Sequence, residues 1–402
     1  DGAAGANMKA CTDSVTAIED LPRMAPHYFA VRIAENTDRE KDLWFKFIES
    51  ANENNTTPGA GFGSGYWKEA VAPNTDTLFS AGTMPHKLVY NDPGFTLSQD
   101  VYDPRGVGTT VSNPDPSFVG NTINDVSSFQ GRAVFLTGSN VCMSRTNKPT
   151  NFWQGSASAL ADTDPIDINS TVESSQMLAA VPFNKDLAVF SPKGQFVVFG
   201  RTALTPSNAK LVLTTKFENE LKAKPVAAGK NVFFASNFGR YTGIREFFAE
   251  TTGDNNDSRP VTQHVNKYLL GTAILLTASA NYETLIVHTN ASQTDVYPYQ
   301  YIWADDKKIQ SAWSTWKFEH SIVHSFFDQD IVYLVQKVGM EYYLLRMPFD
   351  VQNGSDSIEY PLHLDQRFDV FGCNKQFVLP FDYLATSDLV VVQSDDCPTP
   401  GL

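Results

Sequence analysis

The sequence predicts a mainly β protein with β-propeller-like, repeated four-stranded blades and an additional mixed β-rich N-terminal region. Short apolar runs end at turn residues, as strands do. These runs recur at similar steps along the chain. Aromatic residues make up 12% of the sequence, with 28 Phe and 15 Tyr, and such side chains pack well on a pleated surface. The 402 residues are too many for one simple core, which predicts two or three domains or one large β architecture.

Five pairs of apolar runs carry the propeller prediction. Their first members begin 54, 44, 53 and 47 residues apart, and a repeat near fifty residues is typical of a propeller blade. The runs are apolar on both faces, as expected where sheets stack on one another. An array of β-sandwiches remains the alternative. The pairs are Ala133–Leu136 with Val141–Met143, Leu187–Phe190 with Gln195–Phe199, Asn231–Ala235 with Ile244–Phe248, Thr284–Val287 with Val296–Trp303, and Ile331–Val335 with Tyr342–Leu345.

Further strand pairs precede these. Residues 28–33 and 43–48 predict one pair, and residues 88–90 with 95–97 predict one more piece of a blade. Helix is scarce, and only Gly5–Asp20 and Lys216–Lys222 predict short helical segments.

Turn residues predict two long loops, at residues 52–65 and 251–258. We therefore expect three regions: a β-rich accessory region resembling a platform over residues 1–110, a propeller-like region over 111–350, and a truncated C-terminal β segment over 351–402.

Composition narrows the function. The formal net charge is −14, and an acidic surface does not attract phosphates, which argues against direct nucleic-acid binding. No run of eighteen apolar residues predicts a membrane span. The chain begins without Met or an apolar signal core, so we expect processing or a piece of a longer protein. The four cysteines predict free thiols of a reducing cytoplasm, or at most two bridges: Cys11, Cys142, Cys373 and Cys397.

Candidate metal ligands are few. Asp162, Asp164 and Asp167 lie close enough in sequence to hold Ca²⁺, but no Gly or closing Glu completes a binding loop, and Asp beside Pro is a common turn former. His320 and His324 have no Glu between them and lie in a predicted strand, so packing is expected rather than zinc binding. The other isolated histidines considered, His86 and His264, predict structural roles. We predict no catalytic, cofactor or metal residue and no cofactor.

Enzyme motifs are also incomplete. The loop GAGFGSG from Gly59 to Gly65 lacks the G-x-G-x-x-G spacing and a following helix, so a mobile surface loop is expected. No G-x-S-x-G nucleophile elbow occurs. The string from Gln310 to Trp316 lacks the Asp and Gly of a sialidase Asp box, and Trp313 and Trp316 predict contacts between blades.

An ordered series of motifs resembles one family. SFVGNTINDV from Ser117 and QGRAVFLTG from Gln130 are similar to the tail tubular protein B, or nozzle, family of short-tailed, podovirus-type bacteriophages. The similarity runs from about Pro26 to Phe349 and is densest from Ser117 to Tyr268. It continues through VCMSRT from Val141, NFW from Asn151, DPID from Asp164, AVPF from Ala180, LTTKF from Leu213, GKNVFFAS from Gly229 and VTQHV from Val261, and includes TMPHKLV from Thr83.

The resemblance implies a structural virion protein with a propeller in each subunit. It implies a homohexameric ring under a tail adaptor protein, a channel for genome ejection, docking of tail fibres, and assembly in the host cytoplasm. Passing double-stranded DNA would not be bound specifically, and acidic channel walls would give its phosphates no cations to bind.

Two other function classes stay open at this point. The first is a tail-associated propeller that degrades polysaccharide, which needs two carboxylates facing each other about 5 to 9 Å apart. Asp115, Asp125 and Asp328 are candidates that turn formation explains equally well. The second is a glycan-binding module. Tyr297, Tyr299 and Tyr301 alternate on one strand face and would form an aromatic platform if exposed, although core packing is the stronger expectation.

Overall fold

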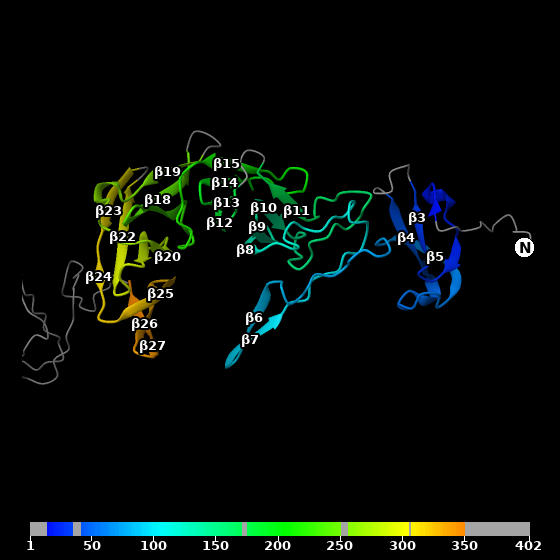
Figure 1. Cartoon of the computed structure of the whole chain (residues 1–402), viewed down its shortest axis with the longest axis horizontal. Helices are drawn as coiled ribbons and strands as arrows, with labels where there is room; N and C mark the ends of the chain where they lie inside the picture. The colour runs from blue at the N-terminus through cyan, green and yellow to red at the C-terminus, as the bar shows by residue number, and fades with distance from the viewer. Residues whose placement is uncertain (1–13, 35–41, 171–174, 251–255, 305–306, 350–402) are drawn as a thin grey trace, which may run out of the picture. The chain divides into compact units, whose positions relative to one another are not determined.

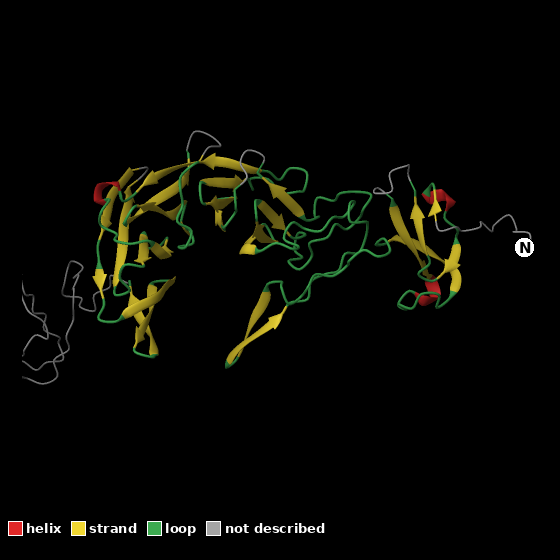
Figure 2. Ribbon diagram, in the orientation of Figure 1, coloured by secondary structure: helices red, strands yellow, loops and turns green. Residues whose placement is uncertain are grey.

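The computed structural model describes residues 14–34, 42–170, 175–250, 256–304 and 307–349. Over these ranges the chain consists of strands and loops (Figure 2). The helical segments among them are three short 3-10 turns: η1 (Ile18–Asp20), η3 (Ser50–Asn52) and η4 (Gln263–Val265). A mixed N-terminal sheet, a two-stranded hairpin and five antiparallel sheets follow in chain order (Figure 1). The predicted class, mainly β with repeated four-stranded sheets and a mixed N-terminal region, is confirmed.

Neither helix prediction holds in the described residues. Residues 1–13 of the first lie outside them, and its end contains strand β1 (Ser14–Val15) and η1. Residues 216–222 contain no helix. There Phe217 and Leu221 pack against a core between two sheets, so tertiary burial overrides the weak helical pattern.

The N-terminal sheet has the order β1-β3-β4-β5-β2, and β1 runs parallel to β3. The strand pair expected at residues 28–33 and 43–48 is confirmed, but the loop expected over 52–65 is wrong from Phe62 onward. A Cβ on Gly65 would lie 2.0 Å from the Ile48 carbonyl oxygen, so this glycine permits close strand packing. The strands are β2 (Met24–Pro26), β3 (Ala30–Ile33), β4 (Leu43–Glu49) and β5 (Phe62–Glu69).

The five antiparallel sheets occupy the remaining described chain. Three have four strands, the fourth has four strands with β24 added on β22, and the last has three. They are β8 (Ile123–Phe129), β9 (Arg132–Thr137), β10 (Asn140–Met143) and β11 (Ile166–Asn169); β12 (Ala179–Phe183), β13 (Asp186–Ser191), β14 (Gly194–Val198) and β15 (Leu211–Thr215); β16 (Val226–Ala228), β17 (Asn231–Phe238), β18 (Tyr241–Ala249) and β19 (Asn256–Pro260); β20 (Ala273–Ser279), β21 (Thr284–Thr289), β22 (Asp295–Ala304), β23 (Lys307–Trp313) and β24 (Trp316–Lys317); and β25 (Ser321–Asp328), β26 (Ile331–Val338) and β27 (Glu341–Pro348).

The five predicted strand pairs are real, but they are the second and third strands of each sheet. The first strands contact one another in chain order: β8 with β12, β12 with β16, β16 with β20, and β20 with β25. The sequence pattern missed several of them because β16 has only three residues and β8 mixes Ile, Val and Phe with Asn, Asp and Ser without regular alternation. The loop expected over 251–258 is also shorter, since Asn256 begins β19, while residues 251–255 lie outside the described ranges.

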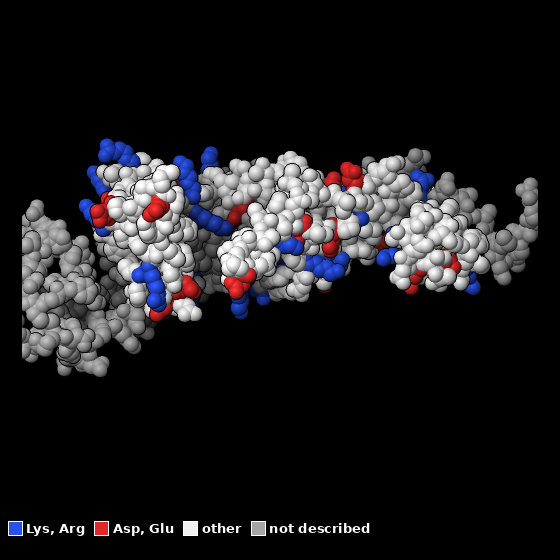
Figure 3. All heavy atoms as spheres, turned by 90° about the horizontal axis from the view of Figure 1, so that it is seen from below, with Lys and Arg blue, Asp and Glu red and all other residues white. Residues whose placement is uncertain are grey.

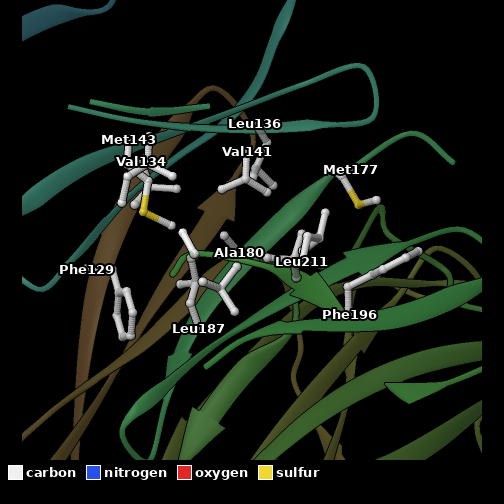
Figure 4. Close-up of a cluster of buried hydrophobic side chains, with 14 of the residues drawn as sticks. Phe129, Val134, Leu136, Val141, Met143, Met177, Ala180, Leu187, Phe196 and Leu211 are labelled. Atoms are coloured by element: carbon white, nitrogen blue, oxygen red, sulfur yellow. The ribbon is translucent and has the colours of Figure 1, made fainter. Parts of the chain in front are cut away.

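Alternate residues of one strand enter different cores. In β13, Leu187 and Val189 belong to a core shared with β8–β11, whereas Ala188 and Phe190 belong to a core shared with β16–β19. Figure 4 shows the first of these, with Phe129, Leu136 and Met143 from one sheet beside Leu187 and Phe196 from the next. Burial on both sides explains why these strands are continuously apolar.

Strands β6 (His86–Asn91) and β7 (Gly94–Gln99) form a two-stranded sheet of their own (Figure 1). The prediction that residues 88–90 and 95–97 belong to a blade is therefore wrong. Every residue of β6 is exposed, so the strand pattern here does not reflect burial in this chain.

Among the described residues, no helix is long and apolar enough to cross a membrane. The predicted region 351–402 lies outside the described residues.

Candidate functional sites: buried charges and the predicted site residues

The three aspartates considered as metal ligands point to different partners. Asp164 is fully buried, and its carboxylate accepts hydrogen bonds from the backbone N–H of Gly155 (3.0 Å) and Ala161 (2.9 Å). Asp167 accepts from the backbone N–H of Ser117 at 2.7 Å, whereas Asp162 is exposed. No group of three potential metal ligands occurs in the described part of the chain. The carboxylates of Asp164 and Asp167 thus hold loop backbone in place. Whether these aspartates bind Ca²⁺ stays a prediction from the sequence.

Arg132 binds the backbone of the loop that contains Asp162 and Asp164 from its buried side. Its guanidinium is buried and donates to the carbonyl oxygens of Ser144 and Asp164, both at 2.7 Å. It also donates to the carbonyls of Asp162 (3.0 Å) and Leu204 (3.2 Å). Burial lowers the pKa of Arg132, partly opposed by Asp164. One arginine therefore holds together the first two sheets and the loop of residues 161–165, a role the sequence did not reveal.

A second buried charge lies between the third and fourth sheets. Glu246 of β18 is fully buried and pairs with Lys308 Nζ of β23 at 2.7 Å and with Arg259 Nε of β19 at 3.2 Å. Asn231 donates to the same carboxylate at 2.6 Å. Burial lowers the pKa of Lys308, and its contact with Glu246 opposes that shift. A fully paired carboxylate of this kind joins two sheets rather than offering a free catalytic group.

The tyrosines of β22 are core residues. Tyr297, Tyr299 and Tyr301 all lie in the cluster between the third and fourth sheets. Trp313 stacks on Tyr299 with ring centroids 4.8 Å apart and donates to the Val261 carbonyl at 3.1 Å. Burial raises the pKa of Tyr299 to about 12. The core-packing expectation is confirmed, the exposed glycan platform is excluded at these three residues, and Trp313 does contact both sheets.

Trp316 also lies at a contact between sheets. It is in β24 and packs against the core shared by the fourth sheet and β25–β27, which confirms the expectation for this second tryptophan.

A buried serine–histidine pair links the last two sheets. His288 Nε2 lies 2.8 Å from Ser325 Oγ, and Ser325 Oγ lies 3.0 Å from Thr277 Oγ1. All three are buried. Burial, with a smaller effect of His324, lowers the pKa of His288 to about 4, so the imidazole is neutral at pH 7. Since the pair is closed to solvent, it serves as a polar contact between sheets.

The other predicted candidates are dispersed. His324 is exposed on β25, but His320 precedes that strand, so the expectation that both lie in one strand is wrong for His320. Asp115 forms an ion pair with the buried Arg105. Asp328 ends β25.

Asp125 is not a turn residue but part of β8. It accepts from Ala180 N–H at 2.8 Å and pairs with Lys224 at 2.7 Å, so one carboxylate ties β8 to β12 and to the segment that leads into β16.

The remaining candidates are structural. The Gly-rich run does not form a phosphate cradle, since Gly63 and Gly65 lie within β5. His86 Nδ1 donates to the carbonyl oxygen of Met84, two residues earlier, at 2.9 Å. Cys142 is a buried free cysteine, and burial raises the pKa of its thiol. The other three cysteines lie outside the described residues.

Comparison with known proteins decides what this scaffold belongs to. Residues 1–394 match the family model for the bacteriophage nozzle protein. The chain belongs to this family. It is 30% identical over 325 residues to the tail tubular protein gp12 of Escherichia phage T7, a match that covers 80% of this chain and 39% of that relative. The chain thus spans well under half of the curated relative that it matches. As a member of this family, it is a structural component of the phage tail and of the virion.

Solved structures show only weak overall similarity. Hsv2p of Kluyveromyces lactis matches with a TM-score of 0.38 and 9% identity, covering 68% of this chain and 74% of that one. Apo AztD from Citrobacter koseri matches with a TM-score of 0.36 and 10% identity, covering 76% of each chain.

Proposed function

We propose that the chain is one subunit of a homohexameric nozzle ring whose channel carries the genome out of the virion. The observation that carries this proposal is the family match over residues 1–394. The stacked sheets support it, because burial on both faces and buried ion pairs between sheets give a rigid wall. The ring would join the tail adaptor protein and the tail fibres.

We also propose a division of labour along the chain. Residues 111–350 form the propeller-like wall, and residues 1–110 form an accessory, platform-like region. Glu69, at the end of β5, accepts from Ser156 Oγ and Ala157 N–H, both at 2.8 Å, so the N-terminal sheet is anchored to a loop of the first antiparallel sheet. Such an anchor suits a part that transmits force to a neighbouring tail protein.

The channel wall is proposed to be non-adhesive to DNA. Supporting this, the net charge is −14, so phosphates find few cations to bind. On the face shown in Figure 3, acidic and basic side chains are scattered among uncharged ones, so the acidic excess does not concentrate on that face. A basic lumen in the assembled ring would contradict this part of the proposal.

Electron microscopy of the purified protein, with two-dimensional class averages, tests the ring directly. We expect six-fold particles with a central channel. Monomers at high concentration, with the tail adaptor protein present, would overturn the proposal. The same particles, incubated with labelled double-stranded DNA at low salt, should show no stable binding.

A further inference from the structure

The β6–β7 hairpin has two faces of opposite character. Cross-strand partners lie on the same face, so Leu88 lies beside Leu97 and Tyr90 beside Phe95 on one side. These four side chains are 62%, 69%, 60% and 70% exposed. The other face has the pairs Lys87–Ser98 and Val89–Thr96. Both faces of this hairpin are exposed, and its large apolar side chains gather on one of them.

Such a hairpin needs a partner. An isolated two-stranded sheet is marginally stable at best in water, and exposed contiguous apolar faces mark interaction sites. Seen from below in Figure 3, the hairpin, located by its place in Figure 1, presents a mostly uncharged surface. Its tip carries the exposed Asp92, and Lys87 pairs with Asp100 at 3.2 Å. Since Lys87 and Asp100 neutralise each other, Asp92 leaves one negative charge at the tip of the apolar hairpin.

The same chain carries a matching surface on its last described sheet. On β25–β27, one face is buried against the fourth sheet, while the opposite face presents Phe326, Tyr333, Leu344 and Tyr342. Phe326 and Tyr333 stack with ring centroids 5.0 Å apart, and Leu344 and Tyr342 are 61% and 62% exposed. The exposed cations Lys337 and Arg346 lie on this face in register with Tyr342 and Tyr333. The exposed Asp328 at its edge carries the opposing charge. The face is apolar and basic where the hairpin is apolar and acidic.

We propose that the apolar face of the β6–β7 hairpin docks on the outer face of β25–β27 of a second copy of this chain. A ring built by head-to-tail contacts needs two different, complementary surfaces on each subunit, which this chain has. Within one copy both surfaces are exposed, so they do not cover each other. This proposal rests on the proposed ring, because it identifies the two surfaces that join neighbouring subunits. In the contact, Asp92 would face Arg346 or Lys337.

The first test replaces apolar groups on the hairpin. Leu88→Ser with Leu97→Ser should raise the dissociation constant between subunits at least about tenfold, measured by mass photometry across a dilution series. The matched control, Val89→Ser with Thr96→Ser, changes the cross-strand pair on the opposite face and should leave assembly unchanged. Circular dichroism and melting temperature should be the same in both variants, because all four positions are solvent-exposed or nearly so.

The second test maps the contact. A photo-crosslinking phenylalanine analogue at position 95, in a mixture of ¹⁴N- and ¹⁵N-labelled protein, should give mixed-isotope cross-links to peptides of residues 331–348. Asp92→Lys and Arg346→Asp should each weaken assembly, and together they should restore it.

The outcomes separate this contact from the ring itself. The proposed hairpin contact is wrong, and the ring proposal stands, if the Leu88→Ser, Leu97→Ser variant forms rings as wild type does. The same conclusion follows if the cross-links fall elsewhere or within one copy. If the wild-type protein does not self-associate at all, both proposals fail.

Discussion

The sheet β12–β15 and the hairpin β6–β7 are made from similar residues yet have opposite environments. In the sheet, every residue of β13 and β14 is buried. In the hairpin, Leu88, Tyr90, Phe95 and Leu97 are at least 60% exposed. Apolar strand composition therefore does not tell whether a strand lies in the core of its own chain or faces something outside it. In a structural protein both uses are expected, because assembly surfaces are cores completed by another molecule.

The comparison is tested most strongly by removing one aromatic side chain from each region. Phe190→Ala should lower the free energy of unfolding by about 3–5 kcal/mol, because Phe190 is fully buried and packs against Phe234 and Phe247. Phe95→Ala should stay within about 0.5 kcal/mol of wild type in the unassembled chain. Urea unfolding at low protein concentration measures both, and equal losses would remove the distinction between the two regions.

A charge buried between sheets should also be costly to break. Glu246→Ala should lower the free energy of unfolding by about 3 kcal/mol, because Lys308 and Arg259 lose their shared carboxylate in a buried site.

The matched control for this charge is Lys224→Ala. It removes a half-exposed partner of Asp125 and should cost less than about 1 kcal/mol. If Glu246→Ala costs no more than this control, the cluster does not hold the sheets together. Thermal unfolding followed by circular dichroism would rank the two.

Because of His288, the free energy of unfolding should depend on pH. Its pKa is about 4 in the folded chain, below the ordinary value of 6.5, so the unfolded chain binds the proton first as the pH falls. Stability is therefore lost between pH 6.5 and pH 4, by about 1.4 kcal/mol per pH unit and about 3 kcal/mol in total. His288→Gln should flatten this part of the profile in urea titrations from pH 7 to pH 4.

The matched histidine control is His264→Asn, because His264 is exposed. The profile of this variant should keep the wild-type slope. A wild-type profile that is flat over the same window would contradict the buried neutral imidazole.

The smallest effect is expected from the N-terminal sheet. Gly65→Ala should destabilise by about 1–3 kcal/mol, since the new Cβ would overlap the Ile48 carbonyl of the neighbouring strand. Gly94→Ala, at the start of β7, meets nothing within 4 Å and should be neutral in the unassembled chain. Equal melting temperatures for the two variants would show that β4 and β5 have room to separate.

Much of the scaffold followed from periodicity. The runs at Leu187–Phe190 and Thr284–Val287 are buried on both faces, and the sequence pattern predicted both their strand state and their stacking. The first strand of each sheet was harder to predict, because β16 is too short for a periodic signal and β8 carries polar residues that form hydrogen bonds to neighbouring sheets. Asp125 looked like a turn residue for this reason, whereas it joins β8 to β12.

Contacts between residues far apart in the chain could not be predicted from the sequence. Glu246 and Lys308 lie 62 positions apart, and no local pattern pairs them. The Gly-rich run looked like a loop, since glycine usually marks turns, and only the close approach of β4 shows why Gly65 lies in a strand.

The sequence alone determined the β class, the repeated strand pairs and, through its ordered motifs, the nozzle family, because alternation, turn residues and motif order are local properties of the chain. The tertiary structure decided which apolar strands are buried, which charges are paired between sheets, and which apolar face is left for another molecule. These depend on what surrounds each strand in space, and burial free energy is a property of the contact, which residues far apart in the chain create together.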